Sequence, residues 1–383
     1  MKIGILTGGG DVPGLNTVIR DVVYRSAREK EKIGVIGIRR GWGGLVYLDP
    51  ERKDIDSEHA GLLDEPSVRK IDREGGTWLH TSRTNPLKIK NHPNLAEFRG
   101  IKFEGERDMT KDVMKNLENL KIDVLIATGG DDTLSYARHL KKIGFPVMGI
   151  PKTMDCDVAG TDYCIGFSTA ISRATEYITA LRSCLGSHER IGVIEIFGRD
   201  SGFTGLYAAL AAKPDRVVIP EVDFDMDKLV GLLYDDKRKN KSRYSIVLAS
   251  EGAKPIGCNA IYQSDRRDQY NHKKLGGIGR LIEENIKEKL NIETIEYRLA
   301  HLIRSGAPDA KDKICASVFA NIVFDAIIRK EYGMMAAIIN SKPTIVSLEE
   351  SASSPKKVDV GRFYNSERYR PNYQNLEGSL LLL

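Results

Sequence analysis

Two acidic stretches of the chain hold a dense group of carboxylate, ammonium and hydroxyl side chains. They are Gly-Gly-Asp-Asp-Thr at 129–133 and Pro-Lys-Thr-Met-Asp-Cys-Asp at 151–157. Each follows a short apolar run, 124–127 or 147–150, of the kind that forms a buried parallel strand. The carboxylates would then follow the carboxyl ends of two strands, where open α/β sheets bind ligands. Four Asp, one Lys and two Thr gathered there predict a site for a metal ion and phosphate.

The two carboxylates of the first stretch, Asp131 and Asp132, would stand at the start of a helix. Carboxylates there gain from the helix dipole, so a pure capping role is one interpretation. The other is that Asp131 holds Mg²⁺ against phosphate oxygens, because hard divalent cations prefer one or two carboxylates together with substrate phosphates. The residues favour this second interpretation.

Asp155 and Asp157 flank a single residue in the loop after the second strand. This spacing suits metal-assisted phosphoryl transfer, in which one carboxylate accepts a proton from an attacking hydroxyl group while its neighbours organise the phosphate. An Asx-rich turn without chemistry is the alternative. Lys152 argues against that alternative, because a cation beside several carboxylates in a cleft indicates bound phosphate.

A third candidate is the loop Gly8-Gly-Gly-Asp-Val-Pro-Gly14, which joins a predicted strand to a predicted helix. Its backbone N–H groups and the helix N-terminus could hold a phosphate, or the loop could be a tight turn of no chemical role. It matches neither G-x-G-x-x-G nor the Walker A pattern. The loop alone therefore leaves both interpretations open.

Several further polar residues lie in loops. Four arginines lie in or near loops that contain Gly, Ser or His, namely Arg83, Arg190, Arg199 and Arg304. A guanidinium group fits phosphate in bidentate fashion, but each could equally be a solvated or ion-paired surface residue. His301 is open in the same way. Glu251, after a strand at 246–249, either accepts hydrogen bonds from sugar hydroxyl groups or caps a loop.

Alternating strand and helix patterns would position these loops. Short apolar runs predict strands at 3–7, 35–38, 122–127, 146–150, 191–196, 217–219 and 246–248. Apolar residues at helical spacing predict helices that begin near 16, 132 and 168, and others over 203–212, 225–236, 277–289 and 309–330. Polar segments at 237–243 and 263–274 are predicted to be surface loops. Repeated β-α alternation predicts an α/β fold of parallel sheets with helices on both faces.

Length and composition narrow the class of protein. With 383 residues, 41% of them hydrophobic and 29% charged, the chain is typical of a soluble globular protein of two domains. The net charge of +5 is too small, and the basic residues too scattered, to indicate nucleic acid as the main partner. Five Cys without C-x-x-C spacing predict a reducing cytosol rather than disulfides or a zinc site. We expect no signal peptide and no membrane-spanning helix.

Motifs recur in a fixed order from Met1 to about residue 330. They are Leu6-Thr-Gly-Gly-Gly-Asp-Val-Pro-Gly-Leu-Asn16, Gly129–Thr133, Pro151–Asp157, Gly160–Phe167, Ser187-His-Glu-Arg190, Gly198-Arg199, Ala249–Gly252 and His301–Gly306. This ordered series resembles the phosphofructokinase family. Chance could supply one such motif, but not the whole series.

The resemblance implies two similar three-layer α/β/α domains with mostly parallel sheets and an active site in the cleft between them. Residues 1–166 with about 305–355 would form the domain that binds the phosphoryl donor, 167–304 the domain that binds the sugar phosphate, and 356–383 a C-terminal tail. The implied reaction is Mg²⁺-dependent transfer of phosphate to O1 of fructose 6-phosphate. The implied protein is a cytoplasmic homodimer or homotetramer.

The family's functional residues carry over position by position. Asp155 would be the base that deprotonates the sugar hydroxyl group, and Thr153 would contact the sugar phosphate or the transferred group. Asp131 and Asp157 would hold Mg²⁺, and Arg199 would stabilise charge on the transferred phosphate. The donor would be held by Gly9, Gly10 and Arg83. The sugar phosphate would be held by Gly198, Glu251, His301, Arg304 and, from a neighbouring subunit, Arg190.

Two positions indicate which donor is used. ATP-dependent members of the family typically have Gly at the positions of Asp132 and Lys152. A side chain at 132 takes the room that the α-phosphate of a nucleotide needs, and its charge repels that phosphate. Lys152 supplies a cation for a small polyanion. The pair resembles the pyrophosphate-dependent branch, whose reaction would be close to reversible.

Some positions depart from the family's pattern. Phe197 stands for the usual Met, Cys156 for Asn, and Ser305 for Gly. Ile295 stands where an Arg is expected, although Arg298 lies nearby, and this leaves the acceptor sugar open. Tyr24 replaces an Arg of the effector site, so we expect weak or absent nucleotide allostery.

Three other functions stay open. They are an ATP-dependent phosphofructokinase or a related kinase of another phosphorylated ketose, a catalytically silent homologue that binds phosphosugars or a catalytic subunit, and a Rossmann oxidoreductase. The intact set Asp131, Thr153, Asp155, Asp157 and Arg199 argues against a silent homologue. The glycine loop lacks the dinucleotide spacing, which disfavours the oxidoreductase.

Overall fold

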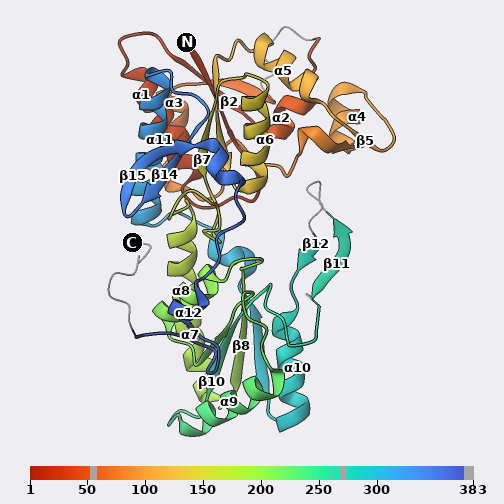
Figure 1. The fold of residues 1–383 in the computed structure, drawn as a ribbon, viewed down its shortest axis with the longest axis vertical. Coiled ribbons are helices and arrows are strands. Elements are labelled where there is room, and N and C mark those ends of the chain that lie inside the picture. Colours follow the sequence, from red (N-terminus) through yellow and green to blue (C-terminus); the bar gives the residue numbers. More distant parts are fainter. Residues whose placement is uncertain (52–57, 260, 268–272, 375–383) are drawn as a thin grey trace.

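The computed structural model describes residues 1–51, 58–259, 261–267 and 273–374. They form two lobes stacked along the long axis of the molecule (Figure 1). The first lobe is built on a seven-stranded sheet and the second on a four-stranded sheet. The expected α/β fold with mostly parallel sheets and helices on both sides is confirmed.

The first-lobe sheet has its edge strands reversed. Its strand order is β15 (Lys342–Ser347), β14 (Met334–Ile339), β7 (Val147–Pro151), β6 (Val124–Gly129), β1 (Lys2–Thr7), β2 (Gly34–Ile38) and β3 (Ala60–Leu63). All neighbours are parallel except at the two edges, where β15 is antiparallel to β14 and β3 is antiparallel to β2. The central strands are therefore the parallel ones, and their carboxyl ends point the same way.

Burial on both faces explains the continuous apolar run of β6. Val124 lies in one hydrophobic cluster with residues of α1 (Leu15–Ala27) and α11 (Ala310–Ile328). The next residue, Leu125, lies in a second cluster with residues of α6 (Asp131–Lys142). Successive side chains of a strand point to opposite faces, so both faces need apolar residues.

The second-lobe sheet is entirely parallel. Its strand order is β13 (Thr294–Arg298), β8 (Ile191–Ile196), β10 (Ser245–Ser250) and β9 (Arg216–Val218). Its helices contact one another in pairs, α7 (Phe167–Ser187) with α8 (Phe203–Ala212) and α9 (Met226–Lys239) with α10 (Ile278–Leu290). Both pairs pack on the sheet.

The other elements are short. They are α2 (Trp42–Tyr47), α3 (Glu65–Val68), β4 (Ile89–Lys90), α4 (Pro93–Arg99), β5 (Glu106–Arg107), α5 (Thr110–Asn119), β11 (Tyr262–Arg267), β12 (Lys273–Leu275) and the 3-10 turns η1 (Ile71–Arg73), η2 (Pro86–Lys88), η3 (Ala300–Arg304) and η4 (Leu348–Ala352). Within the described ranges, no helix is both long and apolar enough to cross a membrane.

Two of the predicted surface loops differ from the structure. The prediction for 263–274 is wrong, because its described ends pair as the antiparallel hairpin β11–β12. The polar sequence there shows no apolar alternation, so the backbone pairing could not be anticipated. At 237–243 the prediction fails at its start, because α9 continues to Lys239.

The described part of the C-terminal tail, 356–374, returns from the first lobe and lies along the second (Figure 1). It forms α12 (Val360–Phe363), β16 (Tyr364–Asn365) and β17 (Arg370–Pro371). The backbone N–H of Val217 in β9 donates to the carbonyl of Tyr369 at 2.8 Å. This segment therefore covers the β9 edge of the four-stranded sheet, and residues 375–383 lie outside the described ranges.

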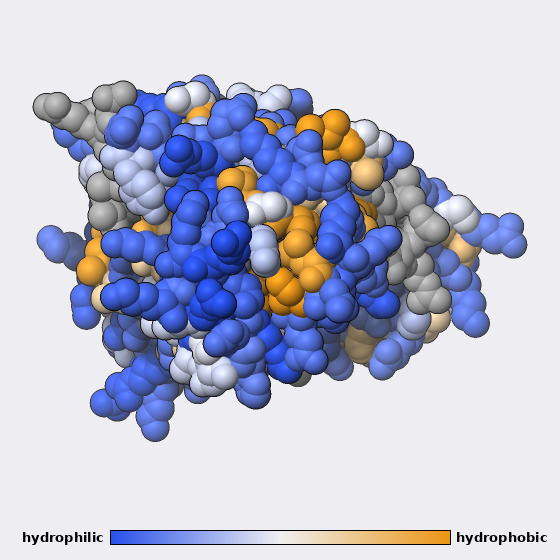
Figure 2. Space-filling view, turned by 90° about the horizontal axis from the view of Figure 1, so that it is seen from below, coloured by the Kyte–Doolittle hydropathy of each residue, from blue (hydrophilic) through white to orange (hydrophobic). Residues whose placement is uncertain are grey.

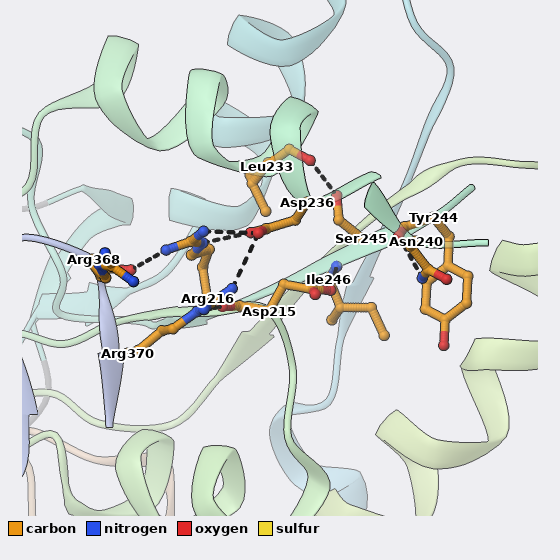
Figure 3. Close-up of polar contacts among 10 residues, drawn as sticks. All are labelled: Asp215, Arg216, Leu233, Asp236, Asn240, Tyr244, Ser245, Ile246, Arg368 and Arg370. Atoms are coloured by element: carbon orange, nitrogen blue, oxygen red, sulfur yellow. Dashed lines mark hydrogen bonds and ion pairs between the residues drawn. The ribbon is translucent and has the colours of Figure 1, made fainter. Parts of the chain in front are cut away.

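A cluster of charged side chains fixes this segment to α9 (Figure 3). The Asp236 carboxylate accepts hydrogen bonds from Arg216 Nε at 2.6 Å and from Arg370 Nη2 at 3.1 Å. Arg216 Nη1 also donates to the Arg368 carbonyl at 2.6 Å, and Arg370 Nε donates to the Asp215 carbonyl at 2.7 Å. Helix α9, strand β9 and the C-terminal segment thus meet at one carboxylate.

Candidate active site

Neighbouring strands bring the candidate residues of the first lobe to one edge of the sheet. In register, Thr7 of β1 is opposite Thr128 of β6, and Gly129 of β6 is opposite Pro151 of β7. The loops after these strands carry the glycines at 8–10, the acidic pair at 131–132 and the segment 152–157. In the second lobe the carboxyl ends of β8, β10 and β13 carry the loops with Gly198, Glu251 and His301 in the same way.

The glycine loop after β1 is packed so closely that side chains would collide. A Cβ atom at Gly8 would lie 2.5 Å from Thr133 Oγ1, and one at Gly10 would lie 2.7 Å from Arg304 Nη1. Gly9 has φ 78°, a left-handed conformation that favours glycine. The loop is thereby held between the start of α6 and an arginine of η3.

Lys152 brings a positive charge beneath this loop. Its side chain is 3% exposed, and Nζ donates to the Gly10 carbonyl at 2.5 Å. Burial, and then the nearby Arg304 and Arg83 charges, lowers the pKa of Lys152 from 10.5 to about 8, although Asp11 acts in the opposite direction. Arg304 Nη2 lies 3.3 Å from Asp11 Oδ1. Lys152 thus lies among other cations, and such a group is suited to a bound polyanion.

Asp155 lies where the two lobes touch. Thr204, in the first turn of α8, donates its hydroxyl to the Met154 carbonyl at 3.0 Å and to Asp155 Oδ1 at 3.4 Å. Burial, followed by the charges of Asp157 and Glu251, raises the pKa of Asp155 well above its usual range, while Arg199 opposes this rise. Asp155 thus interacts with residues of both lobes, and burial strengthens it as a proton acceptor.

The turn between the two carboxylates of this loop is unusual in its backbone. Cys156 has φ 53°, in the left-handed region, and its buried Sγ contacts the Asp162 carbonyl at 3.3 Å. The Thr153 hydroxyl accepts a hydrogen bond from the Asp155 N–H at 3.2 Å. Burial raises the pKa of Asp157, its hydrogen bond with Thr153 opposes this, and the charge of Asp131 adds to the rise.

The carboxylates of Asp131 and Asp157 interact electrostatically across the carboxyl ends of β6 and β7. The Asp131 side chain is 58% exposed, with Arg138 Nη1 3.7 Å from its Oδ1. Among the described residues, no group of three or more His, Cys, Asp or Glu is arranged to hold a metal ion. Two carboxylates together with phosphate oxygens fit Mg²⁺, which keeps water and phosphate among its ligands.

The second lobe contributes two loops that touch each other. The Gly252 N–H donates to the Gly198 carbonyl at 3.0 Å, and a Cβ atom at Gly252 would lie 1.9 Å from the Arg199 carbonyl oxygen. Gly198 has φ 135°. Burial raises the pKa of Glu251 to about 7, while the charges of Arg199 and Arg298 act in the opposite direction.

Phe197 provides an aromatic surface for two of the candidate sugar-phosphate ligands. The His301 ring is stacked on it at a centroid distance of 5.9 Å, and Arg304 Cζ lies 5.8 Å from the ring centroid. A guanidinium group over an aromatic face is held by the ring quadrupole. Where the family usually has Met, this chain therefore has an aromatic ring that lies against both side chains.

Arg190 is the candidate that the structure does not bring to this group. It precedes β8, whose six residues separate it from Gly198 by roughly 20 Å, and it forms an ion pair with Glu293. Ile295 lies at the same end, in register with Gly192. Within one subunit, Arg190 therefore cannot share a ligand with the other candidate residues.

Two residues near the site were missed by reasoning from the sequence. No sequence pattern points to Thr204, because it is a single hydroxyl residue at the start of an Ala-rich helix. Glu195 could have been found, since it is a carboxylate in the otherwise apolar strand Ile-Gly-Val-Ile-Glu-Ile. It is buried and lies in register with Arg298.

Similar proteins extend over nearly the whole chain. A pyrophosphate–fructose 6-phosphate 1-phosphotransferase of Thermoproteus tenax is 38% identical over 373 residues, which are 97% of this chain and 99% of that protein. ATP-dependent 6-phosphofructokinase 3 of Streptomyces coelicolor is 36% identical over 367 residues, which are 96% of this chain and 99% of that protein. Relatives of similar sequence identity to this chain are thus named for two different phosphoryl donors, ATP and pyrophosphate.

The fold is also found in solved structures. The crystal structure of a pyrophosphate-dependent phosphofructokinase from Marinobacter aquaeolei aligns with a TM-score of 0.76 at 17% identity, covering 98% of this chain and 90% of that chain. The sequence profile of the phosphofructokinase family matches residues 2–327. The chain therefore belongs to the phosphofructokinase family of phosphotransferases.

Proposed function

We propose that this protein is a cytoplasmic, Mg²⁺-dependent pyrophosphate–fructose 6-phosphate 1-phosphotransferase. The observation that carries the donor assignment is the buried Lys152 ammonium group, which lies beneath the glycine loop and interacts with the charges of Arg304, Arg83 and Asp132. A compact group of cations suits a small polyanion. The carboxylate of Asp132 in the same group would repel the α-phosphate of a nucleotide.

The chemistry follows from the placement of Asp155. Its carboxylate would take the proton from O1 of the sugar, and O1 would form a bond to the nearer phosphorus of pyrophosphate. The bond from that phosphorus to the bridging oxygen would break, and its electron pair would leave with inorganic phosphate. Arg199 would stabilise the charge on the transferred group, and Thr153 would contact it. The products are fructose 1,6-bisphosphate and phosphate.

The metal would be held by Asp131 and Asp157 together with oxygens of the donor. When bound, Mg²⁺ would neutralise charge on the phosphate oxygens. Burial is the main cause of the raised pKa of Asp157 and repulsion from Asp131 adds to it, and a neighbouring cation would offset both effects. The glycine loop and Arg83 would hold the remainder of the donor from the first lobe.

The acceptor would be bound mainly by the second lobe. Glu251 would accept hydrogen bonds from sugar hydroxyl groups, and His301 and Arg304 would contact the 6-phosphate. We infer that Arg190 reaches this phosphate in a neighbouring subunit of a homodimer or homotetramer. The end of the second lobe is mainly hydrophilic with a compact hydrophobic patch near its centre, which is compatible with a specific subunit contact (Figure 2).

Steady-state assays with fructose 6-phosphate and Mg²⁺ test the donor. We expect turnover with pyrophosphate, little with ATP, and a weaker use of pyrophosphate in the double variant Asp132→Gly with Lys152→Gly. Turnover with ATP alone, or unchanged pyrophosphate kinetics in the double variant, would contradict the proposal.

An ATP-dependent 6-phosphofructokinase is the second candidate. It is favoured by the name of the Streptomyces coelicolor relative, which is 36% identical to this chain. The same assay separates the two, because the donors are tested side by side with one acceptor.

A further inference from the structure

Arg298 lies at the carboxyl end of β13 between two acidic side chains. Its Nε is 2.9 Å from Glu195 Oε1, and its Nη2 is 3.8 Å from Glu251 Oε2. Nη2 also donates to the Leu275 carbonyl at 3.1 Å. One guanidinium group therefore joins a carboxylate of the candidate active site to a carboxylate outside it.

Glu195 is the fixed end of this arrangement. Its side chain is 2% exposed, and Oε2 accepts hydrogen bonds from the N–H groups of Gly277 at 2.8 Å and Gly279 at 3.0 Å. Gly277 is the N-cap of α10, so the helix N-terminus adds a favourable interaction with the carboxylate. A buried carboxylate held in this way has little freedom and needs a cation beside it.

Glu251 is the end that faces the site. It lies in the loop after β10, is 9% exposed, and its N–H donates to the Ile196 carbonyl at 2.9 Å. The charged groups that act on it are Arg199, Arg298, Glu195 and Arg83, and its own charge acts on Asp155 and Arg304. Burial opposes its ionisation, and Arg298 is one of the cations that offset this effect.

We propose that Arg298 is a positioning residue, which holds the Glu251 carboxylate against the anchored Glu195 so that Glu251 presents its oxygens to the hydroxyl groups of the acceptor sugar. The inference rests on the proposed function in assigning Glu251 to the sugar. The inference goes beyond the proposed function, because it assigns part of the affinity for the acceptor sugar to Arg298, which acts on the sugar through Glu251. It also predicts that Arg298 acts on the acceptor and not on the donor.

The test compares Arg298→Met and Arg298→Lys with the full-length wild type. We expect Arg298→Met to raise KM for fructose 6-phosphate by about 10-fold or more, with a much smaller change in KM for pyrophosphate. Without the guanidinium charge, the pKa of Glu251 rises above its wild-type value of about 7, so the loss should be largest between these two pKa values and diminish at lower and at higher pH. Arg298→Lys should restore part of the affinity, because it restores the charge without the fork geometry.

Control variants separate this role from a structural one. Arg280→Met removes an exposed guanidinium group that pairs with Glu284 at 2.8 Å, and it should leave both KM values unchanged. If Arg298→Met does not fold, Glu195→Gln combined with Arg298→Met removes the unpaired buried charge and should restore folding with KM still raised. Equal changes in both KM values, or an unaltered pH dependence of the acceptor KM, would overturn the proposal.

Calorimetric titration with fructose 6-phosphate makes this inference testable apart from the donor assignment. A wild type that binds the sugar phosphate but turns over no pyrophosphate would overturn the proposed function alone. The inference would then be judged by whether Arg298→Met weakens that binding. A wild type that binds no fructose 6-phosphate would overturn both.

Discussion

Burial is the main cause that lowers the pKa of the Lys152 ammonium group. Its pKa is about 8 in the folded chain, against 10.5 for an exposed lysine. Between these values the unfolded state binds more protons than the folded state, so stability of the free protein should increase as pH rises through this window. The same rise in pH removes the cation that we propose binds the donor.

We therefore expect kcat/KM for pyrophosphate to fall above about pH 8, since this ratio reports ionisations of the free enzyme. Lys152→Arg should move this alkaline limb to higher pH, because a guanidinium group stays protonated. The measurement is a pH profile of kcat/KM at constant free Mg²⁺. An alkaline limb at the same pH in the variant would mean that another group titrates there.

Cys156 has a left-handed backbone conformation, with φ 53°. Cys156→Val should lower the free energy of unfolding by about 1–3 kcal/mol, because a β-branched side chain is strained in this conformation. Cys156→Asn is the matched control, since Asn adopts it readily. Urea denaturation of both variants checks this, and equal losses would contradict it.

The sequence could predict which residues form the candidate site where they lie in contiguous motifs, as at 129–133 and 151–157. The pairing of Glu195 with Arg298 could not, because it depends on the register of β8 against β13, which are distant in sequence. The stacking of His301 on Phe197 also depends on tertiary packing.

At the scale of elements, Asp236 of α9 binds arginines from β9 and from the C-terminal segment (Figure 3). Its side chain is 9% exposed and that of Arg216 is 5% exposed. Asp236→Ala would leave the Arg216 charge buried without its carboxylate. We expect a loss of about 3–5 kcal/mol in the free energy of unfolding.

Asp325→Ala is the matched control for this prediction. Asp325 also accepts a hydrogen bond from an arginine, Arg25, at 3.1 Å, but its side chain is 48% exposed. Its loss should cost less than about 1 kcal/mol, because exposed ion pairs contribute little. Chemical denaturation of both variants gives the comparison, and similar losses would contradict the burial argument.

The central strands and the long helices could be predicted because they carry strong apolar periodicity. Strands β13, β14 and β15 were not predicted. In β13 the sequence Thr-Ile-Glu-Tyr-Arg alternates polar and apolar residues over only five positions, and its place in the sheet comes from backbone pairing with β8.

At the scale of the whole molecule, the C-terminal segment connects the two halves of the candidate site. The Lys356 N–H donates to the Asp157 carbonyl at 2.9 Å. The Val358 N–H donates to Glu221 Oε1 at 2.9 Å, and the same oxygen accepts from the Gly202 N–H at 2.8 Å. The loop that carries Asp157 is therefore bound directly to this segment, and the loop that follows Arg199 is joined to it through Glu221.

A chain that ends at Pro355 should lose both stability and activity. It would expose the β9 edge and leave Asp236 and Arg216 without their C-terminal partners. A chain that ends at Gln374 is the control, since it keeps every contact described above. Thermal unfolding and turnover with fructose 6-phosphate check this, and an active, equally stable protein ending at Pro355 would contradict it.

The return of the tail to the second lobe could not be predicted, because nothing in the polar sequence after 350 indicates its partner. The assignment of 1–166 with about 305–355 to the donor, and of 167–304 to the sugar, stays a prediction. Both rest on the order of motifs and not on a bound ligand.

The path of the chain limits how the two lobes can move. It crosses between them after β7, after β13 and after β15. Each crossing joins the two lobes covalently, so three crossings restrict their relative rotation more than one or two would. Opening and closing should therefore have a small amplitude, and scattering profiles with and without substrates should be nearly superimposable.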